Sequence, residues 1–283
     1  MLFDAIRAEL LRFSRHTQAW LWALLVIPVG TAIVGLFFRQ FLYDQLQKAE
    51  AGLPPRIEEI ANAPLGIGAF LVDQASQLAG INLLAFFLIG AATIAAADYR
   101  WETWRLIRPS NSRMNLMLGK ALAIAAIAII PLLLFLLCEL LGQVISASIE
   151  HRPIVLGMDA KLFGTFITMV LTSWLRVVQV GLLALVAATA TRSLFGGFVI
   201  AIAFGVGTFM VERMFLGFGW KPEEWRTLLL FPSAAYQVVQ TFLAHGPVTP
   251  ATAGKAIIGL LLWIAGLTAL TVWLFQRQDL SKE

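Results

Sequence analysis

The sequence has few charged residues, since Asp, Glu, Lys and Arg together make up 13% of its 283 residues. Apolar residues make up 59%, and the mean hydropathy is +0.80. A typical soluble domain has about 25% charged and about 45–50% apolar residues. These numbers exclude a soluble globular enzyme. They also exclude intrinsic disorder, because disorder requires low hydrophobicity and high charge.

Residues that build most catalytic and metal sites are also scarce. The one cysteine, Cys138, lies in an apolar run and cannot form a disulfide within the chain. The three histidines, His16, His151 and His245, are far apart, and the zinc motif His-Glu-x-x-His is absent. We therefore expect no catalytic residue and no metal site on this chain.

Long apolar runs dominate what remains. A membrane-spanning helix needs about 20 mostly apolar residues, and a span must satisfy its backbone hydrogen bonds internally. Six runs qualify, at residues 20–38, 78–97, 121–141, 162–190, 194–211 and 256–275. The sequence thus predicts an all-α integral membrane protein with six transmembrane helices over residues 20–283. It contains no internal repeat.

The basic residues predict the orientation of these spans. An even number of spans places both termini on one side, and dense basic clusters occur before span one, between spans two and three, and after span six. Basic clusters near span ends mark the cytoplasmic side. We expect a multi-pass protein of a bacterial cytoplasmic membrane with both termini in the cytoplasm. This placement explains the net charge of +4 without nucleic acid as a partner.

Two further segments are predicted to lie at the membrane surface. Within residues 1–19, Leu2, Ile6, Leu10 and Phe13 share one helical face, as in an amphipathic interfacial helix. A basic disordered tail is the alternative. Between spans five and six, an apolar stretch is interrupted by Pro232, and each half is too short to cross the membrane. This pattern predicts a re-entrant or interfacial helix pair, with an amphipathic surface loop as the alternative.

The connection between spans two and three is the most informative, and reads DYRWETWRLIRPSNSRMNLMLGK over residues 98–120. Aromatic residues such as Trp101 and Trp104 suit the membrane interface. A short helix is expected up to Pro109, because the residue before proline disfavours helix. Such a basic helix at the inner face is either a docking surface or a positive-inside anchor.

With these features the chain resembles the permease subunits of type-2 ATP-binding-cassette (ABC) exporters over nearly its whole length. After span two that family commonly has an acid, three residues and Gly-Thr, then Arg-Pro-x-x-Arg and Leu-Gly-Lys. This sequence matches at Asp98, Thr103, Arg108, Pro109, Arg113, Leu118, Gly119 and Lys120. It departs from the family in having Glu102 for the glycine and in placing Arg113 one residue further from Pro109.

The resemblance implies a transport subunit with a separate motor. It implies two copies of an ABC ATPase that carry ATP and Mg, and a second permease protomer, identical or different. The residues expected to couple to the ATPase are Asp98, Tyr99, Arg100, Glu102, Thr103, Trp104, Arg105, Arg108, Pro109 and Arg113. The sequence itself has no Walker A loop, because Gly119-Lys120 and Gly254-Lys255 are each followed by alanine.

Polar residues inside span four raise a second candidate site. Thr168, Thr172, Arg176 and Gln179 are separated by three or four residues and share one helical face. A charge inside the membrane is costly and usually functional. Glu139 of span three lies at a compatible depth, so we expect an Arg176–Glu139 ion pair that either fixes helix packing or lines a pathway. An integral-membrane enzyme and a secondary transporter are the alternative functions.

Overall fold

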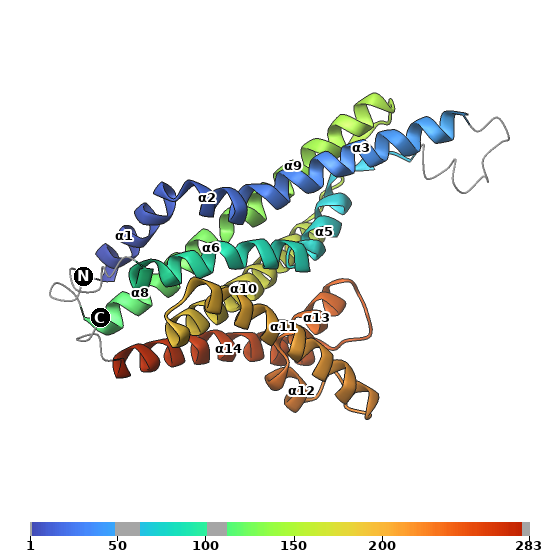
Figure 1. Ribbon diagram of the computed structural model, residues 1–283. Helices are drawn as coiled ribbons and strands as arrows, with labels where there is room; N and C mark the ends of the chain where they lie inside the picture. Colours follow the sequence, from blue (N-terminus) through green and yellow to red (C-terminus); the bar gives the residue numbers. More distant parts are fainter. Residues whose placement is uncertain (1, 49–62, 101–111, 279–283) are drawn as a thin grey trace.

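The computed structural model describes residues 2–48, 63–100 and 112–278, and within these ranges the chain is almost entirely helical (Figure 1). In chain order the elements are α1 (Leu2–Arg15), α2 (Thr17–Trp20), the π-helical turn η1 (Leu21–Leu25), α3 (Val26–Lys48), β1 (Leu65–Gly66), α5 (Ile67–Gln77), α6 (Ile81–Arg100), α8 (Arg113–Ile127), α9 (Ile129–Ile149), β2 (Ile154–Val155), α10 (Ala160–Thr191), α11 (Leu194–Gly217), α12 (Trp225–Leu230), α13 (Pro232–Leu243) and α14 (Pro250–Arg277). The two short strands pair in parallel.

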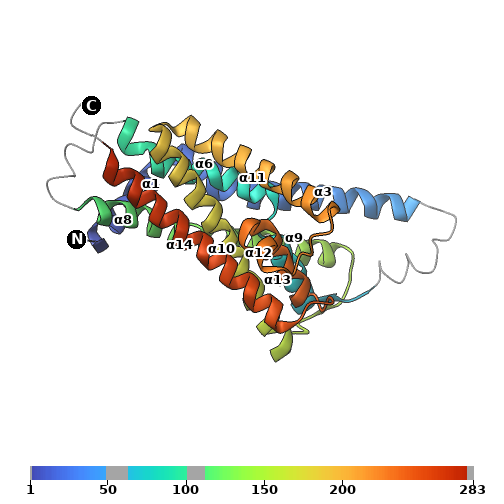
Figure 2. The same cartoon turned by 90° about the horizontal axis from the view of Figure 1, so that it is seen from below.

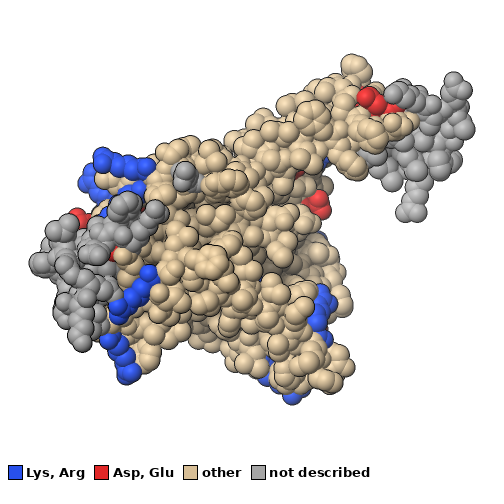
Figure 3. Space-filling model, viewed as in Figure 1, with Lys and Arg blue, Asp and Glu red and all other residues tan. Residues whose placement is uncertain are grey.

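Six helices of the described part are long and apolar enough to cross a membrane. They are Leu21–Gln45, Ile81–Tyr99, Arg113–Ile149, Ala160–Thr191, Leu194–Gly217 and Pro250–Arg277. Large apolar side chains such as Leu137, Phe204 and Leu262 are exposed on their outer faces. Figure 3 shows the result as a broad surface free of charged side chains between the two ends of the molecule. The prediction of an all-α membrane protein with six spanning helices is confirmed at this level.

Several helices extend past the charged residues that mark the predicted span ends. The first span continues beyond Arg39 to Gln45, and α11 continues beyond Glu212 to Gly217. The third spanning helix begins at Arg113, well before Lys120. A buried charge with a partner does not have to end a helix, and Glu212 and Lys120 are both 1% exposed.

The third spanning helix is interrupted once. α8 ends at Ile127 and α9 begins at Ile129, two residues before Pro131. Proline has no backbone N–H and cannot donate to the carbonyl of Ile127, so the helical ladder is broken here. α8 packs against α1, whereas α9 packs against α3, and α3 and α9 project together from the rest of the molecule (Figure 1).

α10 is the central helix. It packs against α5, α6, α11, α13 and α14, and more than half of its most apolar stretch is buried. At Gly181 the neighbouring helices approach closely: a Cβ atom there would lie 2.6 Å from Cγ2 of Ile124 on α8 and 2.9 Å from Cε1 of Phe87 on α6. Only glycine allows this three-helix contact.

One end of the molecule gathers segments that are distant in sequence. The start of α1, the end of α6, the start of α8 and the end of α14 lie together there (Figures 1 and 2). Lys and Arg side chains are also visible at this end (Figure 3). Both ends of the 101–111 connection therefore emerge beside both ends of the described chain.

We expect Gly181→Ala to lower the melting temperature of the detergent-purified protein. The added methyl group overpacks the contact between α6, α8 and α10, at a cost of about 1–3 kcal/mol. The matched control is Gly205→Ala on α11, where a Cβ would meet nothing within 4 Å. That change should be neutral or stabilising, because alanine favours helix over glycine. Equal melting temperatures for the two variants would contradict the packing at Gly181.

Candidate functional site

Lys120 lies at the centre of a buried ionic cluster at this end of the molecule. Its ammonium group is 2.8 Å from Oδ2 of Asp98 and 3.2 Å from Oε2 of Glu9, and it donates to the carbonyl of Ile94 at 2.8 Å. The ammonium group thus has two hydrogen-bond acceptors, Glu9 and Ile94, and a second carboxylate in direct ionic contact. Lys120 and Asp98 are each 1% exposed. A buried charge is tolerated only when it is paired and hydrogen-bonded in this way.

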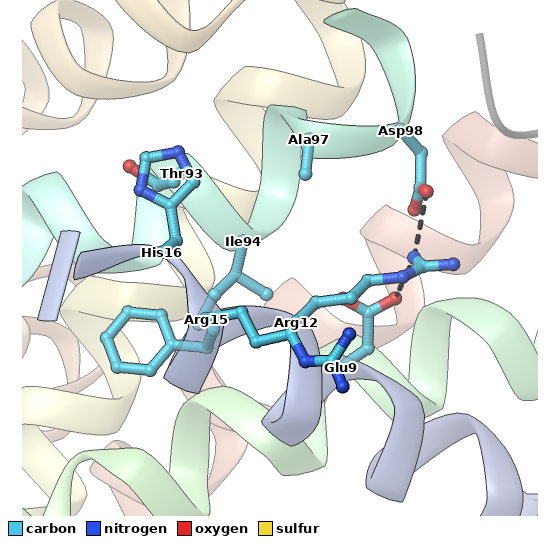
Figure 4. A pocket seen from close by; sticks show the side chains of 9 residues that line it. Glu9, Arg12, Arg15, His16, Thr93, Ile94, Ala97 and Asp98 are labelled. Carbon is cyan, nitrogen blue, oxygen red and sulfur yellow. Dashed lines mark hydrogen bonds and ion pairs between the residues drawn. The ribbon is translucent and has the colours of Figure 1, made fainter. Parts of the chain in front are cut away.

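Arg12 completes the cluster from α1. Its Nη1 atom is 2.9 Å from Oδ1 of Asp98 and 3.1 Å from Oε1 of Glu9 (Figure 4). Two cations thus face two carboxylates, and the cluster carries no net charge. Because its members come from α1, α6 and α8, it holds the N-terminal helix against the last turn of α6 and the middle of α8.

Gly119 lets α1 come close enough for these contacts. A Cβ atom at position 119 would lie 2.8 Å from Cβ of Ala5 and 3.3 Å from the carbonyl carbon of the same residue. Real Cβ atoms essentially never approach a neighbour that closely. The Gly119-Lys120 pair therefore has two separate roles: glycine provides the room, and lysine provides the charge.

Arg113 binds the C-terminal end of α14. Its Nη1 atom donates to the carbonyls of Gln276 at 2.8 Å, Gln278 at 3.0 Å and Phe275 at 3.3 Å. The last carbonyls of a helix have no partner within the helix, and a cation satisfies them and the helix dipole together. The first residue of α8 is thereby fixed to the last turn of α14.

Gln278 extends this anchoring to two more helices. Its side chain accepts a hydrogen bond from Tyr99 of α6 at 2.9 Å and donates to the carbonyl of Thr189 of α10. On the other side of the connection, Ser112 caps α8 by accepting from the backbone N–H of Asn115 at 3.2 Å. The described residues at both ends of the 101–111 connection are thus held by side-chain hydrogen bonds.

Three of the residues expected to couple to an ATPase take part in the contacts described above. They are Asp98, Tyr99 and Arg113. Arg100 is the last residue of α6. The others, Glu102, Thr103, Trp104, Arg105, Arg108 and Pro109, lie outside the described residues. Asp98 faces Lys120 and Arg12 inside the protein, and these ion pairs hold the end of α6, where the connection starts.

The hydroxyl groups of the polar stripe in α10 are satisfied within the helix. Thr168 donates to the carbonyl of Gly164 at 2.8 Å, and Thr172 donates to that of Thr168 at 2.9 Å. Bonds of this type are common for threonine in helices. Thr172 and Gln179 are buried, at 3% and 1% exposed, so this part of the stripe faces protein.

The predicted ion pair between Arg176 and Glu139 is not formed. Arg176 donates to Gln179 on its own helix, whereas the carboxylate of Glu139 is 3.9 Å from Nη2 of Arg39. The reason is the packing of α9, which lies mainly against α3, while α10 packs mainly elsewhere. Equal depth in the membrane does not place two side chains on facing surfaces.

Arg176 instead belongs to a polar cluster that sequence reasoning missed. It lies close enough to Glu212 of α11 to feel that carboxylate's charge, and Tyr236 of α13 is also nearby, although neither forms a direct ion pair with it. Ser233 of α13 donates to Glu212, and the hydroxyl of Tyr236 is 3.0 Å from that of Ser173. These contacts attach the α12–α13 segment to α10 and α11. The sequence feature that could have indicated this cluster is Glu212. An acid at the edge of an apolar run, however, is also what an ordinary span end looks like.

Comparisons with known proteins add no assignment. A scan against models of known protein families found no match to this chain, and a search of curated proteins found no significant match.

We expect Lys120→Met to destabilise the protein strongly. Removing one partner of a buried ion pair leaves uncompensated charge, at a cost of about 3–5 kcal/mol. Lys161→Met, at an exposed lysine at the start of α10, is the matched control and should change the melting temperature little. Adding Asp98→Asn to Lys120→Met should restore part of the loss. No recovery in the double variant would contradict the Lys120–Asp98 pair.

A double-mutant cycle distinguishes the two possible partners of Arg176. The effects of Arg176→Ala and Glu212→Ala on the free energy of unfolding should be non-additive, with a coupling of about 0.5–3 kcal/mol. The effects of Arg176→Ala and Glu139→Ala should be additive within about 0.5 kcal/mol, because these residues have separate partners. The reverse pattern would place Arg176 beside Glu139 in the folded protein.

Proposed function

We propose that this chain is the permease subunit of an ABC exporter and moves its substrate across the cytoplasmic membrane while separate ATPase subunits hydrolyse ATP. The proposal rests on the resemblance at residues 98–120 and on one structural observation. Both ends of the 101–111 connection are bonded to spanning helices. An ATPase bound to that connection would thus act on the transmembrane helices and not on a loose loop.

The bonds on each side of the connection define how a displacement would spread. Asp98 links α6 to α8 and α1, and Arg113 links α8 to α14. Tyr99 and Gln278 join α6, α14 and α10. A push on the connection would therefore move these five helices together, as in the rigid-body transitions by which ligands switch proteins between two states.

The finer membrane placement is part of the same proposal. α1 has arginines at its C-terminal end and would lie in the inner interface, with both termini in the cytoplasm. α12 and α13 are too short to span and would form the re-entrant pair on the outer side. A second copy of the chain, or a related permease, would cover part of the exposed apolar surface.

A secondary transporter is the second candidate, and the Arg176–Glu212 cluster is the observation that favours it. Ionisable residues within spans mark ion and proton pathways in many transporters. Such a protein would work without an ATPase. Binding of an ATPase therefore separates the two functions.

We expect an ABC ATPase to co-purify with the tagged full-length chain in mild detergent. Arg105→Glu, within the connection, should reduce the amount of bound ATPase at least about tenfold, since reversing a charge at a docking surface costs several kcal/mol. The control is Lys221→Glu, an exposed lysine beyond the end of α11. It should retain the ATPase fully.

The two functions give different results in this experiment. A preparation free of ATPase, under conditions that keep known ABC complexes intact, would overturn the exporter proposal and favour the secondary transporter. Equal ATPase loss in both charge variants would show that the connection is not the docking surface.

A further inference from the structure

A cavity of about 340 Å³ lies between α1 and α6, next to the ionic cluster. The side of α1 contributes Phe13, Arg15 and His16, and the side of α6 contributes Thr93, Ile94 and Ala97 (Figure 4). Glu9, Arg12 and Asp98 of the ionic cluster also line it. Its volume is in the range of pockets that bind small molecules.

The unpaired charge at this cavity is positive. Glu9 and Asp98 are neutralised by Lys120 and Arg12. Arg15 and His16 are exposed, and within the described residues neither forms an ion pair or a side-chain hydrogen bond. An entering ligand therefore meets one permanent cation and one imidazole at the open side, without an uncompensated acid behind them.

The rest of the cavity wall is mainly apolar. Phe13 and Ile94 are 6% and 4% exposed, and Ala97 adds a methyl group. The hydroxyl of Thr93 already donates to the carbonyl of Ile89 at 2.7 Å, so its proton is not available to an anionic ligand. The cavity thus combines an apolar wall with a basic rim. That combination fits an amphiphilic anion better than a small soluble one.

We propose that this cavity binds one anionic phospholipid of the membrane, with the phosphate at Arg15 and His16 and part of an acyl chain against Phe13, Ile94 and Ala97. Arginine forms strong charge-assisted hydrogen bonds with phosphate oxygens. Basic pockets beside spanning helices are suited to anionic headgroups. The site depends on the membrane location of the chain and not on the ATPase, so it stands or falls separately from the exporter function.

Bound lipid would stabilise the N-terminal part of the fold. The cavity shares Arg12 and Asp98 with the ionic cluster, and α1 forms one of its walls. A ligand that bridges α1 and α6 therefore binds the folded state and not the unfolded one. It raises the melting temperature in a saturable, concentration-dependent way.

The test uses the full-length chain in detergent, titrated with phosphatidylglycerol or with phosphatidylcholine. Melting temperature and the number of retained lipids in native mass spectrometry are the readouts. Phosphatidylglycerol should give a saturable rise and one retained lipid, and phosphatidylcholine should give neither. Arg15→Gln with His16→Gln should weaken the apparent affinity roughly tenfold or more, because the variant loses its hydrogen-bond donors to the phosphate, the arginine charge among them.

Two further variants make the test specific. Arg7→Gln removes an exposed arginine of the same helix that does not line the cavity, and should leave the affinity within about twofold, since one exposed charge pair contributes little. Ala97→Phe fills the apolar part without altering charge and should abolish the retained lipid. If Ala97→Phe does not fold, Thr93→Leu tests the same wall.

Four results would overturn the proposal. Equal effects of the two lipids, or equal weakening by Arg7→Gln, would indicate general attraction of α1 to anionic surfaces. Protection by inorganic phosphate or glycerol phosphate at the same concentrations would indicate a small-anion site. Unchanged lipid retention in the wall-filling variant would show that no acyl chain occupies the cavity.

Discussion

The rest of the structure depends on one charge that is completely buried. Lys120 is 1% exposed and lies within an otherwise apolar helix, so its ammonium group must be neutralised inside the protein. Asp98 and Glu9 neutralise it, and Arg12 balances the second negative charge. This requirement fixes the positions of α1, α6 and α8 relative to one another more strictly than apolar packing in a bilayer can, because lipid is as apolar as the side chains it would replace.

Buried charges of this kind also limit how much of the structure can be predicted from the sequence. The six spans, the helical N-terminus and the Pro232 break follow from run length, periodicity and proline chemistry, which are local properties of the sequence. The charged residues that flank the predicted apolar runs do not end the helices. Arg39, Lys120 and Glu212 each lie within a helix and face a partner from another helix. Only the packing of those helices decides whether a charge points to water or to a partner.

The partners of Arg176 show that depth along a helix is not enough to predict an ion pair. Depth along a helix can be counted from the sequence at about 1.5 Å per residue, and it placed Arg176 and Glu139 at similar heights. The direction in which each helix presents its side chains depends on its neighbours, and these are α3 for Glu139 and the α11–α13 region for Arg176. Of the residues proposed for coupling, Asp98, Tyr99 and Arg113 contact neighbouring helices at the two ends of the connection. Their contact with a partner remains a prediction.

The break between α8 and α9 divides the third spanning helix between two sets of ionic contacts. α8 is bound through Lys120 to α1 and α6, whereas α9 is bound through Glu139 to Arg39 of α3. No backbone hydrogen bond can cross from Pro131 to Ile127. The two halves of this helix are thus anchored separately, and a tilt of the α3–α9 arm about Ala128 would require neither ionic contact to open.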